Sequence, residues 1–191
     1  MTTVDEFKNK LRDKTISDLE IVQECITHGS AFVFQGDDGK YFKLKKTIAQ
    51  EFGLNPQKVI MTGSAKLGFS ISPLKLWQPF NDDSDIDMVI ISPELFDKFW
   101  KELYDFNIDL TDRSEKEDKQ YRDFLSYFFR GWLRPDMFPF SYPGRTAWFE
   151  FFRSISYGDY GNHKVTGAIF RNDNFYESYH IRNIRAIRPE V

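Results

Sequence analysis

Two short stretches of this chain carry residue types that could bind phosphate and a metal ion. The apolar segment 59–62 ends at the pair Gly63-Ser64, and Asp85-Ile86-Asp87 opens a second apolar segment. Side chains alternate along a strand, so Asp85 and Asp87 are expected to project from one face while Ile86 points to the other. Burying two carboxylates together is costly, and a divalent metal ion would remove that cost.

The glycine–serine pair supplies the complementary feature. It ends the first strand in a turn, and free backbone N–H groups at the start of a following helix suit a phosphate. A phosphate-binding turn beside a carboxylate metal site is the arrangement that phosphoryl or nucleotidyl transfer requires. Lys66, just after the turn, would bring a positive charge to the phosphates. An ordinary solvated helix lysine is the alternative interpretation.

The order of the two motifs resembles that of the nucleotidyltransferase superfamily typified by DNA polymerase β. Its members carry a Gly-Ser turn followed by an Asp-x-Asp strand. Gly63 and Ser64 stand at the positions of the first motif, and Asp85 and Asp87 at those of the second. The resemblance covers residues 45–100, so the chain looks like a compact member of the superfamily.

This resemblance implies transfer of a nucleoside monophosphate from an NTP, by default ATP, to an acceptor. It assigns Asp85 and Asp87 as catalytic residues and as ligands of Mg²⁺ or Mn²⁺. It assigns Gly63, Ser64 and Lys66 to binding of the NTP co-substrate. Compact relatives often act in bacterial toxin–antitoxin or phage-defence systems. The short chain and its small net charge favour a protein or small-molecule acceptor.

One departure from the family pattern is the spacing of the motifs. Members place the acid pair about a dozen residues after the serine, whereas residues 65–84 separate them here. The segment 69–83 is rich in residues that break regular structure, which predicts an inserted loop at the rim of the site. This loop either shapes an acceptor pocket or is a spacer without function.

The second departure concerns a third carboxylate, which active members usually carry on a neighbouring strand. The strand predicted at 165–171 contains no acidic residue. Glu177 and Asp136 are the candidates elsewhere in the chain. If neither takes that place, the alternative is a nucleotide- or protein-binding module that has lost catalysis.

The chain has 191 residues, of which 41% are hydrophobic, and this fits a single domain over 1–191. The patterns predict an α/β (α+β) fold with a small mixed sheet, flanking helices and additional C-terminal helices. Its core would span residues 30–110 plus the strand 165–171, with a helical insertion at 111–156. Further predicted elements are a helix at 3–28 with a break near 15–17, a hairpin-like arm at 31–44, helices at 45–52, 93–106 and 146–155 and from 174 on, and strands at 58–62 and 85–91.

Charge and cysteine content limit the partners and the compartment. The net charge of −3 gives no general attraction to nucleic acid, so an extended nucleic-acid substrate is disfavoured. The expected partners are a nucleotide and a protein, the latter as a binding partner or as the acceptor. The single cysteine, Cys25, fits a reducing cytoplasm, and the sequence lacks an apolar run long enough to cross a membrane.

The C-terminal segment leaves two interpretations open. Arg182, Arg185 and Arg188 recur at every third residue beside a parallel set of isoleucines. They form either the solvated side of a docked helix or a contact for an anionic partner. The three histidines show no metal-ligand spacing, and the many aromatic residues of 121–160 are expected to pack in the core or against a partner.

Overall fold

The computed structural model describes residues 2–108, 110 and 112–191. Among these residues one mixed sheet forms, with the strand order β1-β2-β4-β3. Its strands are β1 (Val59–Thr62), β2 (Ile86–Ile91), β3 (Trp132–Leu133) and β4 (Val165–Phe170). β2 runs antiparallel to β1 and parallel to β4, and β3 pairs antiparallel with β4. The predicted α/β fold with a small mixed sheet is therefore confirmed.

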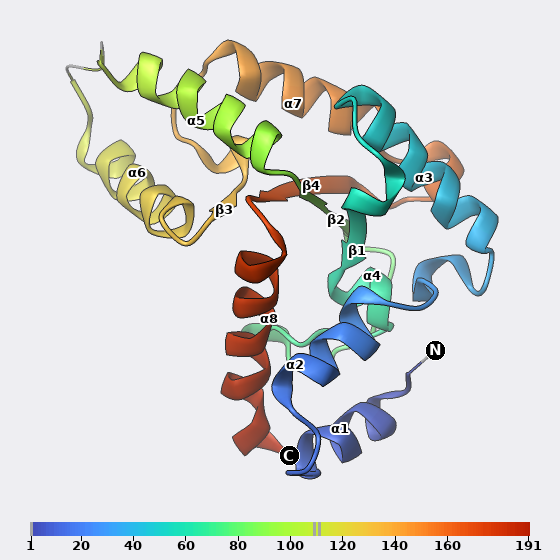
Figure 1. The fold of residues 1–191 in the computed structure, drawn as a ribbon. Coiled ribbons are helices and arrows are strands. Elements are labelled where there is room, and N and C mark those ends of the chain that lie inside the picture. The colour runs from blue at the N-terminus through green and yellow to red at the C-terminus, as the bar shows by residue number, and fades with distance from the viewer. Residues whose placement is uncertain (1, 109, 111) are drawn as a thin grey trace.

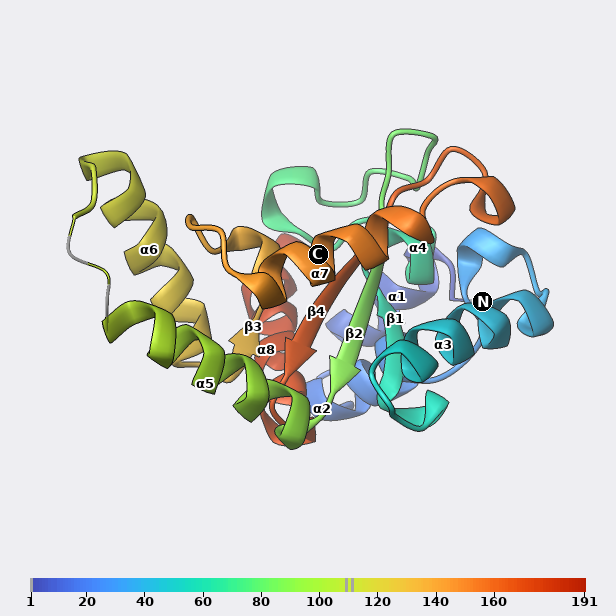
Figure 2. The same cartoon turned by 90° about the horizontal axis from the view of Figure 1, so that it is seen from above.

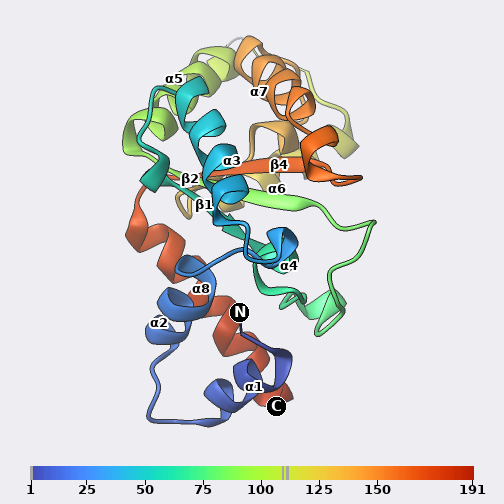
Figure 3. The same cartoon turned by 90° about the vertical axis from the view of Figure 1, so that its right-hand side faces the viewer.

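Helices cover both faces of the sheet. The helices are α1 (Val4–Arg12), α2 (Asp18–Ile21), α3 (Asp38–Glu51), α4 (Gly63–Leu67), α5 (Pro93–Ile108), α6 (Glu115–Phe128), α7 (Pro143–Ser154) and α8 (Asp173–Ile187). α3, α5 and α7 lie over one face (Figures 1 and 2), and α8 and the N-terminal helices lie on the opposite side (Figure 3). α6 packs beside the edge strand β3 (Figure 1).

Alternation along β2 divides the apolar core between these two layers. Ile86, Met88 and Ile90 belong to the large core under α3, α5 and α7. Val89 points the other way and packs with Phe170 and with Tyr176 of α8. Asp87 shares the side of Val89 because side chains alternate along a strand, so it lies on the face that α8 covers.

Most predicted elements are confirmed, and their ends have local causes. The first helix breaks between α1 and α2, where the sequence predicted an interruption. Pro93 begins α5, and the Ser92 hydroxyl accepts a hydrogen bond from the Leu95 N–H at 3.1 Å, as expected for an N-cap. Gly53 follows α3 with a φ of +66°, the left-handed conformation that glycine adopts at the end of a helix.

The hairpin-like arm predicted at 31–44 is wrong. Residues 32–34 form a 3-10 turn, and α3 already begins at Asp38. Asp37, one of the acidic residues that suggested a turn, is instead the N-cap of α3. Its side chain accepts a hydrogen bond from the Lys40 N–H at 2.9 Å. Tyr41, Leu44 and Ile48 are all buried on one side of α3, a helical spacing that the alternation of bulky residues concealed. The short strand β3 was not predicted.

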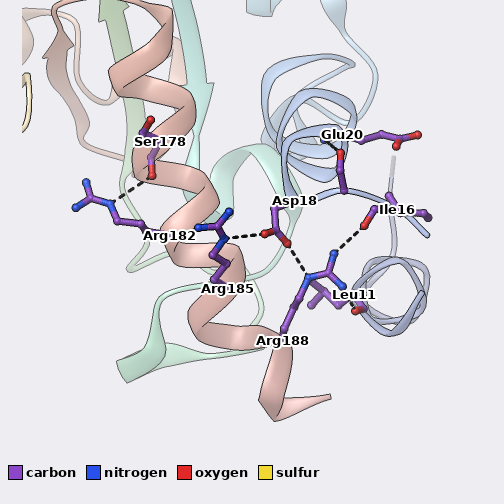
Figure 4. A network of polar contacts seen from close by, with 9 residues as sticks. Leu11, Ile16, Asp18, Glu20, Ser178, Arg182, Arg185 and Arg188 are labelled. Atoms are coloured by element: carbon purple, nitrogen blue, oxygen red, sulfur yellow. Dashed lines mark hydrogen bonds and ion pairs between the residues drawn. The ribbon is translucent and has the colours of Figure 1, made fainter. Parts of the chain in front are cut away.

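Arg185 and Arg188 fasten α8 to the N-terminal segment, whereas Arg182 donates to the Ser178 carbonyl oxygen of its own helix (Figure 4). Asp18 accepts hydrogen bonds from Arg185 Nε at 2.9 Å and from Arg188 Nε at 2.7 Å. Arg188 also donates to the carbonyl oxygens of Leu11 and Ile16. The structure thus favours a docked helix over a free basic stripe.

Two further sequence expectations concern chain organisation. The predicted boundary between the core and the helical insertion falls at 110–111. Position 111 and the neighbouring position 109 lie outside the described residues. Across the ranges that the structure describes, no helix has the length and apolar character needed to cross a lipid bilayer.

Candidate functional site

Strand pairing brings the two sequence motifs together. Thr62, the last residue of β1, lies opposite Asp87 in the antiparallel β1–β2 pair. The next residue, Gly63, has a φ of +70°, and a β-carbon added there would lie only 2.9 Å from Asp87 Oδ2. A side chain at position 63 would therefore meet both backbone strain and a clash with the carboxylate. Asp87 and the Gly63-Ser64 turn therefore lie side by side at one end of the β1–β2 pair.

Asp87 is held by a residue of the neighbouring parallel strand. Thr166 of β4 lies opposite Asp87, and its hydroxyl donates to Asp87 Oδ1 at 2.7 Å. Burial raises the pKa of Asp87, whereas the Thr166 hydrogen bond and the charge of Arg134 act in the opposite direction. Asp85, by contrast, is exposed. The pair thus combines one desolvated carboxylate with one in contact with solvent.

A cleft of about 690 Å³ opens at this point. Gly63, Ser64 and both acids line it, so every predicted site residue except Lys66 borders one space. The loop predicted at 69–83 contributes one wall, including Ser70, Ser72 and Lys75. Most of the remaining lining comes from β2, β4 and α8, and β1 and β3 contribute Thr62 and Trp132. The inserted loop is therefore part of the wall of the cleft.

Arg134, just after β3, places a cation in the same cleft. Its guanidinium donates to Asp136 through Nε at 3.2 Å and through Nη2 at 2.7 Å. Burial opposes its charge, but Asp136 and the charges of Asp87 and Asp85 together raise the pKa of Arg134. Sequence analysis did not identify this residue, because only the pairing of β3 with β4 brings it to the acids.

The two candidates for a third carboxylate have different surroundings. Glu177 accepts a hydrogen bond from Gln23 Nε2 at 2.8 Å and is not among the residues lining the cleft. Asp136 is close enough to Asp87 to influence its pKa, but its two oxygens bind Arg134. The position opposite Asp87 on the neighbouring strand is filled by Thr166.

Lys66 lies away from the acids. Its side chain is buried, its ammonium donates to the Gly29 carbonyl oxygen, and it sits 5.5 Å from the centre of the Tyr41 ring. It lines a second cavity of about 530 Å³ beside His28 and Cys25. Burial lowers the pKa of Lys66 to about 8, and the charge of Lys45 adds to the effect. This placement does not support the phosphate contact assigned to Lys66 by the resemblance.

His180 of α8 is a further residue of the cleft that sequence analysis passed over. It is 6% exposed, and both of its ring nitrogens are buried without a hydrogen-bond partner among the described residues. Burial lowers the pKa of His180 to about 4, so the imidazole is neutral near pH 7. A signal was present in the sequence, because Tyr176, His180 and Ile184 share one buried side of α8.

The donor set at the Gly63-Ser64 turn fits a hard cation such as Mg²⁺. In the described part of the chain, no three His, Cys, Asp or Glu side chains gather into a metal-binding group. Mg²⁺, however, is usually bound by one or two carboxylates together with substrate phosphates and water. Asp87 Oδ2 faces the turn and Asp85 is open to solvent, so two carboxylates are available on the side from which phosphates would approach.

Comparison of the chain with protein-family models, with curated proteins and with solved structures finds no match. The function must therefore be argued from the site itself.

Proposed function

We propose that the chain is a metal-dependent nucleotidyltransferase that moves a nucleoside monophosphate from an NTP to a protein or small-molecule acceptor. The observation that carries the proposal is the meeting of Asp87 with the Gly63-Ser64 turn across the β1–β2 pair. A partly buried carboxylate against a glycine that tolerates no side chain leaves space for a charged ligand at that point. A metal–triphosphate complex is the ligand that matches both halves of the site.

The residues of the chain have separable tasks in this proposal. Asp85 and Asp87 would hold Mg²⁺ or Mn²⁺. The metal would neutralise charge on the phosphates and on the leaving pyrophosphate. The Ser64 hydroxyl and the amides of the turn would bind the terminal phosphates, with Gly63 permitting their close approach. Thr166 would orient Asp87 by its hydrogen bond, and Arg134 would contribute positive charge near the transferred group.

The charge of the chain and the size of the cleft indicate the acceptor. A slightly acidic chain with a cleft of this size favours a protein or small-molecule acceptor over an extended nucleic acid. The resemblance to compact relatives supports a role in a bacterial toxin–antitoxin or phage-defence system. The buried thiol of Cys25 agrees with a place in the cytoplasm.

A specific observation favours a second candidate function. Thr166 occupies the strand position opposite Asp87, where an active member of the resembled family would carry its third carboxylate. A chain that lost this acid could still bind a nucleotide or a protein partner without turnover. The second candidate is therefore a binding module that uses the same cleft.

Incubation with α-labelled NTPs, Mg²⁺ or Mn²⁺ and cell-extract acceptors tests the transferase. We expect label transfer and pyrophosphate release with at least one NTP, and loss of both in Asp85→Ala/Asp87→Ala. Asp82→Ala is the matched control, because Asp82 is exposed near the same site and is not among the residues lining the cleft. NTP binding without release of pyrophosphate from any donor would instead support the binding module.

A further inference from the structure

The wall of the cleft that α8 provides differs in chemistry from the acidic end. Tyr179, His180 and Asn183 line it from successive turns of the helix. Trp132 and Phe170, which also line the cleft, bring aromatic surface to the same region. The rings of Trp132 and Tyr179 are nearly parallel, with an interplanar angle of 8° and centroids 6.0 Å apart. This wall is aromatic and uncharged, unlike the site of the two carboxylates.

His180 supplies the observation that points to a ligand. Buried polar groups almost always have hydrogen-bond partners, and an unsatisfied one costs folding free energy. Both ring nitrogens of His180 are buried without a partner among the described residues, although the ring lines the cleft. A neutral imidazole carries one donor and one acceptor that point in diverging directions, so one ligand edge can pair with one of the two ring nitrogens.

The aromatic surroundings restrict what that group can be. The His180 ring contacts Tyr176 at 4.6 Å and Tyr179 at 5.2 Å between centroids, both edge to face. A cation would find no carboxylate on this wall, and a polyol would leave the aromatic surface without a matching partner. A flat heterocycle can pack against the rings and use a donor or an acceptor on its polar edge to pair with one nitrogen of the imidazole.

We propose that the α8 wall is a nucleobase subsite, in which His180 and Asn183 bind the polar edge of the base and Trp132 and Tyr179 pack against its ring. The proposal rests on the proposed function, since it names the part of the nucleotide that the far wall receives. The α8 residues of the subsite and the two acids line the same cleft, so one ligand can contact both. The neutrality of His180 at physiological pH agrees with recognition of an uncharged base.

Binding of phosphate-free nucleosides tests the subsite without any chemistry. Adenosine, guanosine, cytidine and uridine are titrated into the full chain carrying ¹⁵N-labelled histidine. We expect at least one nucleoside to bind and to shift the ring nitrogens of His180, while those of His28, which lines the other cavity, stay unchanged. Absence of binding by all four, or binding that leaves the His180 signals in place, would overturn the proposal.

Variants then separate the two ends of the cleft. His180→Phe should weaken nucleoside binding by about tenfold or more, the effect of one lost hydrogen bond, and leave binding of Mg²⁺-tripolyphosphate unchanged. His180→Gln, which keeps a donor and an acceptor, should restore part of the affinity. Asp87→Asn should do the reverse, sparing the nucleoside and losing the tripolyphosphate. His28→Phe is the matched control, since His28 lines the other cavity.

The same experiment keeps the subsite and the proposed function distinguishable. Nucleoside binding through His180 without any nucleotidyl transfer would leave the subsite standing and refute the transferase. Transfer that His180→Phe does not alter would support the transferase and refute the subsite. Competition between the nucleoside and the intact NTP would assign the subsite to the donor base, and simultaneous binding would assign it to the base of an acceptor.

Discussion

Thr166 donates its hydroxyl hydrogen to Asp87 at 2.7 Å across the parallel pair of β2 and β4. The bond fixes one oxygen of the carboxylate and leaves the other facing the Gly63-Ser64 turn. Thr166→Val should lower the free energy of unfolding by about 1.5–3 kcal/mol, because a partly buried carboxylate loses its hydrogen-bond donor. Chemical denaturation measures this loss, and Thr166→Ser, which keeps the hydroxyl, should recover most of it.

The same position allows a gain-of-function test. Thr166→Asp would place a third carboxylate opposite Asp87. Without metal the variant should be less stable than wild type, because like charges repel in a partly buried site. Mg²⁺ should reverse the loss and bind more tightly than to wild type, as thermal unfolding against metal concentration would show. If the unfolding temperature of the variant does not change with Mg²⁺ concentration, the result argues against a metal site at this position.

Asp87→Asn should stabilise the fold while removing activity. Burial raises the pKa of Asp87, so the folded chain holds this proton more tightly than the unfolded chain does. Stability therefore falls as pH rises from the unfolded-state value through the folded-state pKa, and the buried charge is a net cost at neutral pH. We expect the asparagine to add about 1–2 kcal/mol near neutral pH and nothing below about pH 4.

Denaturant titrations at several pH values check this prediction, and Asp85→Asn is the control. Asp85 is exposed, so its substitution should leave stability nearly unchanged while still weakening metal binding. Equal stabilisation by the two substitutions would show that burial of Asp87 is not the cause.

Gly63→Ala should damage both the fold and the site. A left-handed backbone costs a non-glycine residue about 1 kcal/mol, and the new β-carbon would also meet Asp87 Oδ2. Gly53→Ala is the matched control, because Gly53 has a similar φ of +66° with no atom within 4 Å of the added carbon. Unfolding should show a larger loss for Gly63→Ala, and only that variant should lose NTP binding. Equal losses of stability in Gly63→Ala and Gly53→Ala would show that backbone strain, and not the contact with Asp87, causes the loss.

Lys66 should make the free energy of unfolding vary with pH in the alkaline range. Its pKa falls from the ordinary lysine value of 10.5 to about 8 in the folded chain. Between these values the unfolded chain holds more protons, so stability rises as pH rises through that window. Lys66→Met keeps the length of the side chain without the charge and should abolish the rise. Wild type and variant should therefore differ most below about pH 8 and converge towards 10.5, which unfolding midpoints across that range would measure.

Arg185 and Arg188 of α8 bind Asp18 of the N-terminal segment, and the stability of this clamp should depend on Arg188 more than on Arg185. The Arg188 side chain is 23% exposed and binds Asp18 and two carbonyl oxygens, whereas Arg185 is 69% exposed. Arg188→Met should cost about 2 kcal/mol, and Arg185→Met less than about 1 kcal/mol because exposed ion pairs contribute little. Arg182→Met is the control, since Arg182 donates within its own helix to the Ser178 carbonyl oxygen. A larger loss of stability in Arg185→Met or Arg182→Met than in Arg188→Met would contradict this role of Arg188.

Local signals in the sequence determined most of the secondary structure. Apolar runs identified β1, β2 and β4, and Ser92-Pro93 marked the start of α5. These signals are short-range, since each depends on residues within a few positions of one another. The same locality explains the wrong hairpin, where bulky residues alternated over too short a stretch to separate a strand from the start of α3.

The composition of the site was decided by the tertiary structure. The motifs identified Gly63, Ser64, Asp85 and Asp87, but the pairing of β4 with β2 put Thr166 against the partly buried Asp87. The same sheet placed Arg134 in the cleft. Lys66 turned to a second cavity because α4 presents it to the carbonyl of Gly29. Such contacts join residues far apart in the chain, and only the packing of strands and helices fixes which of them meet.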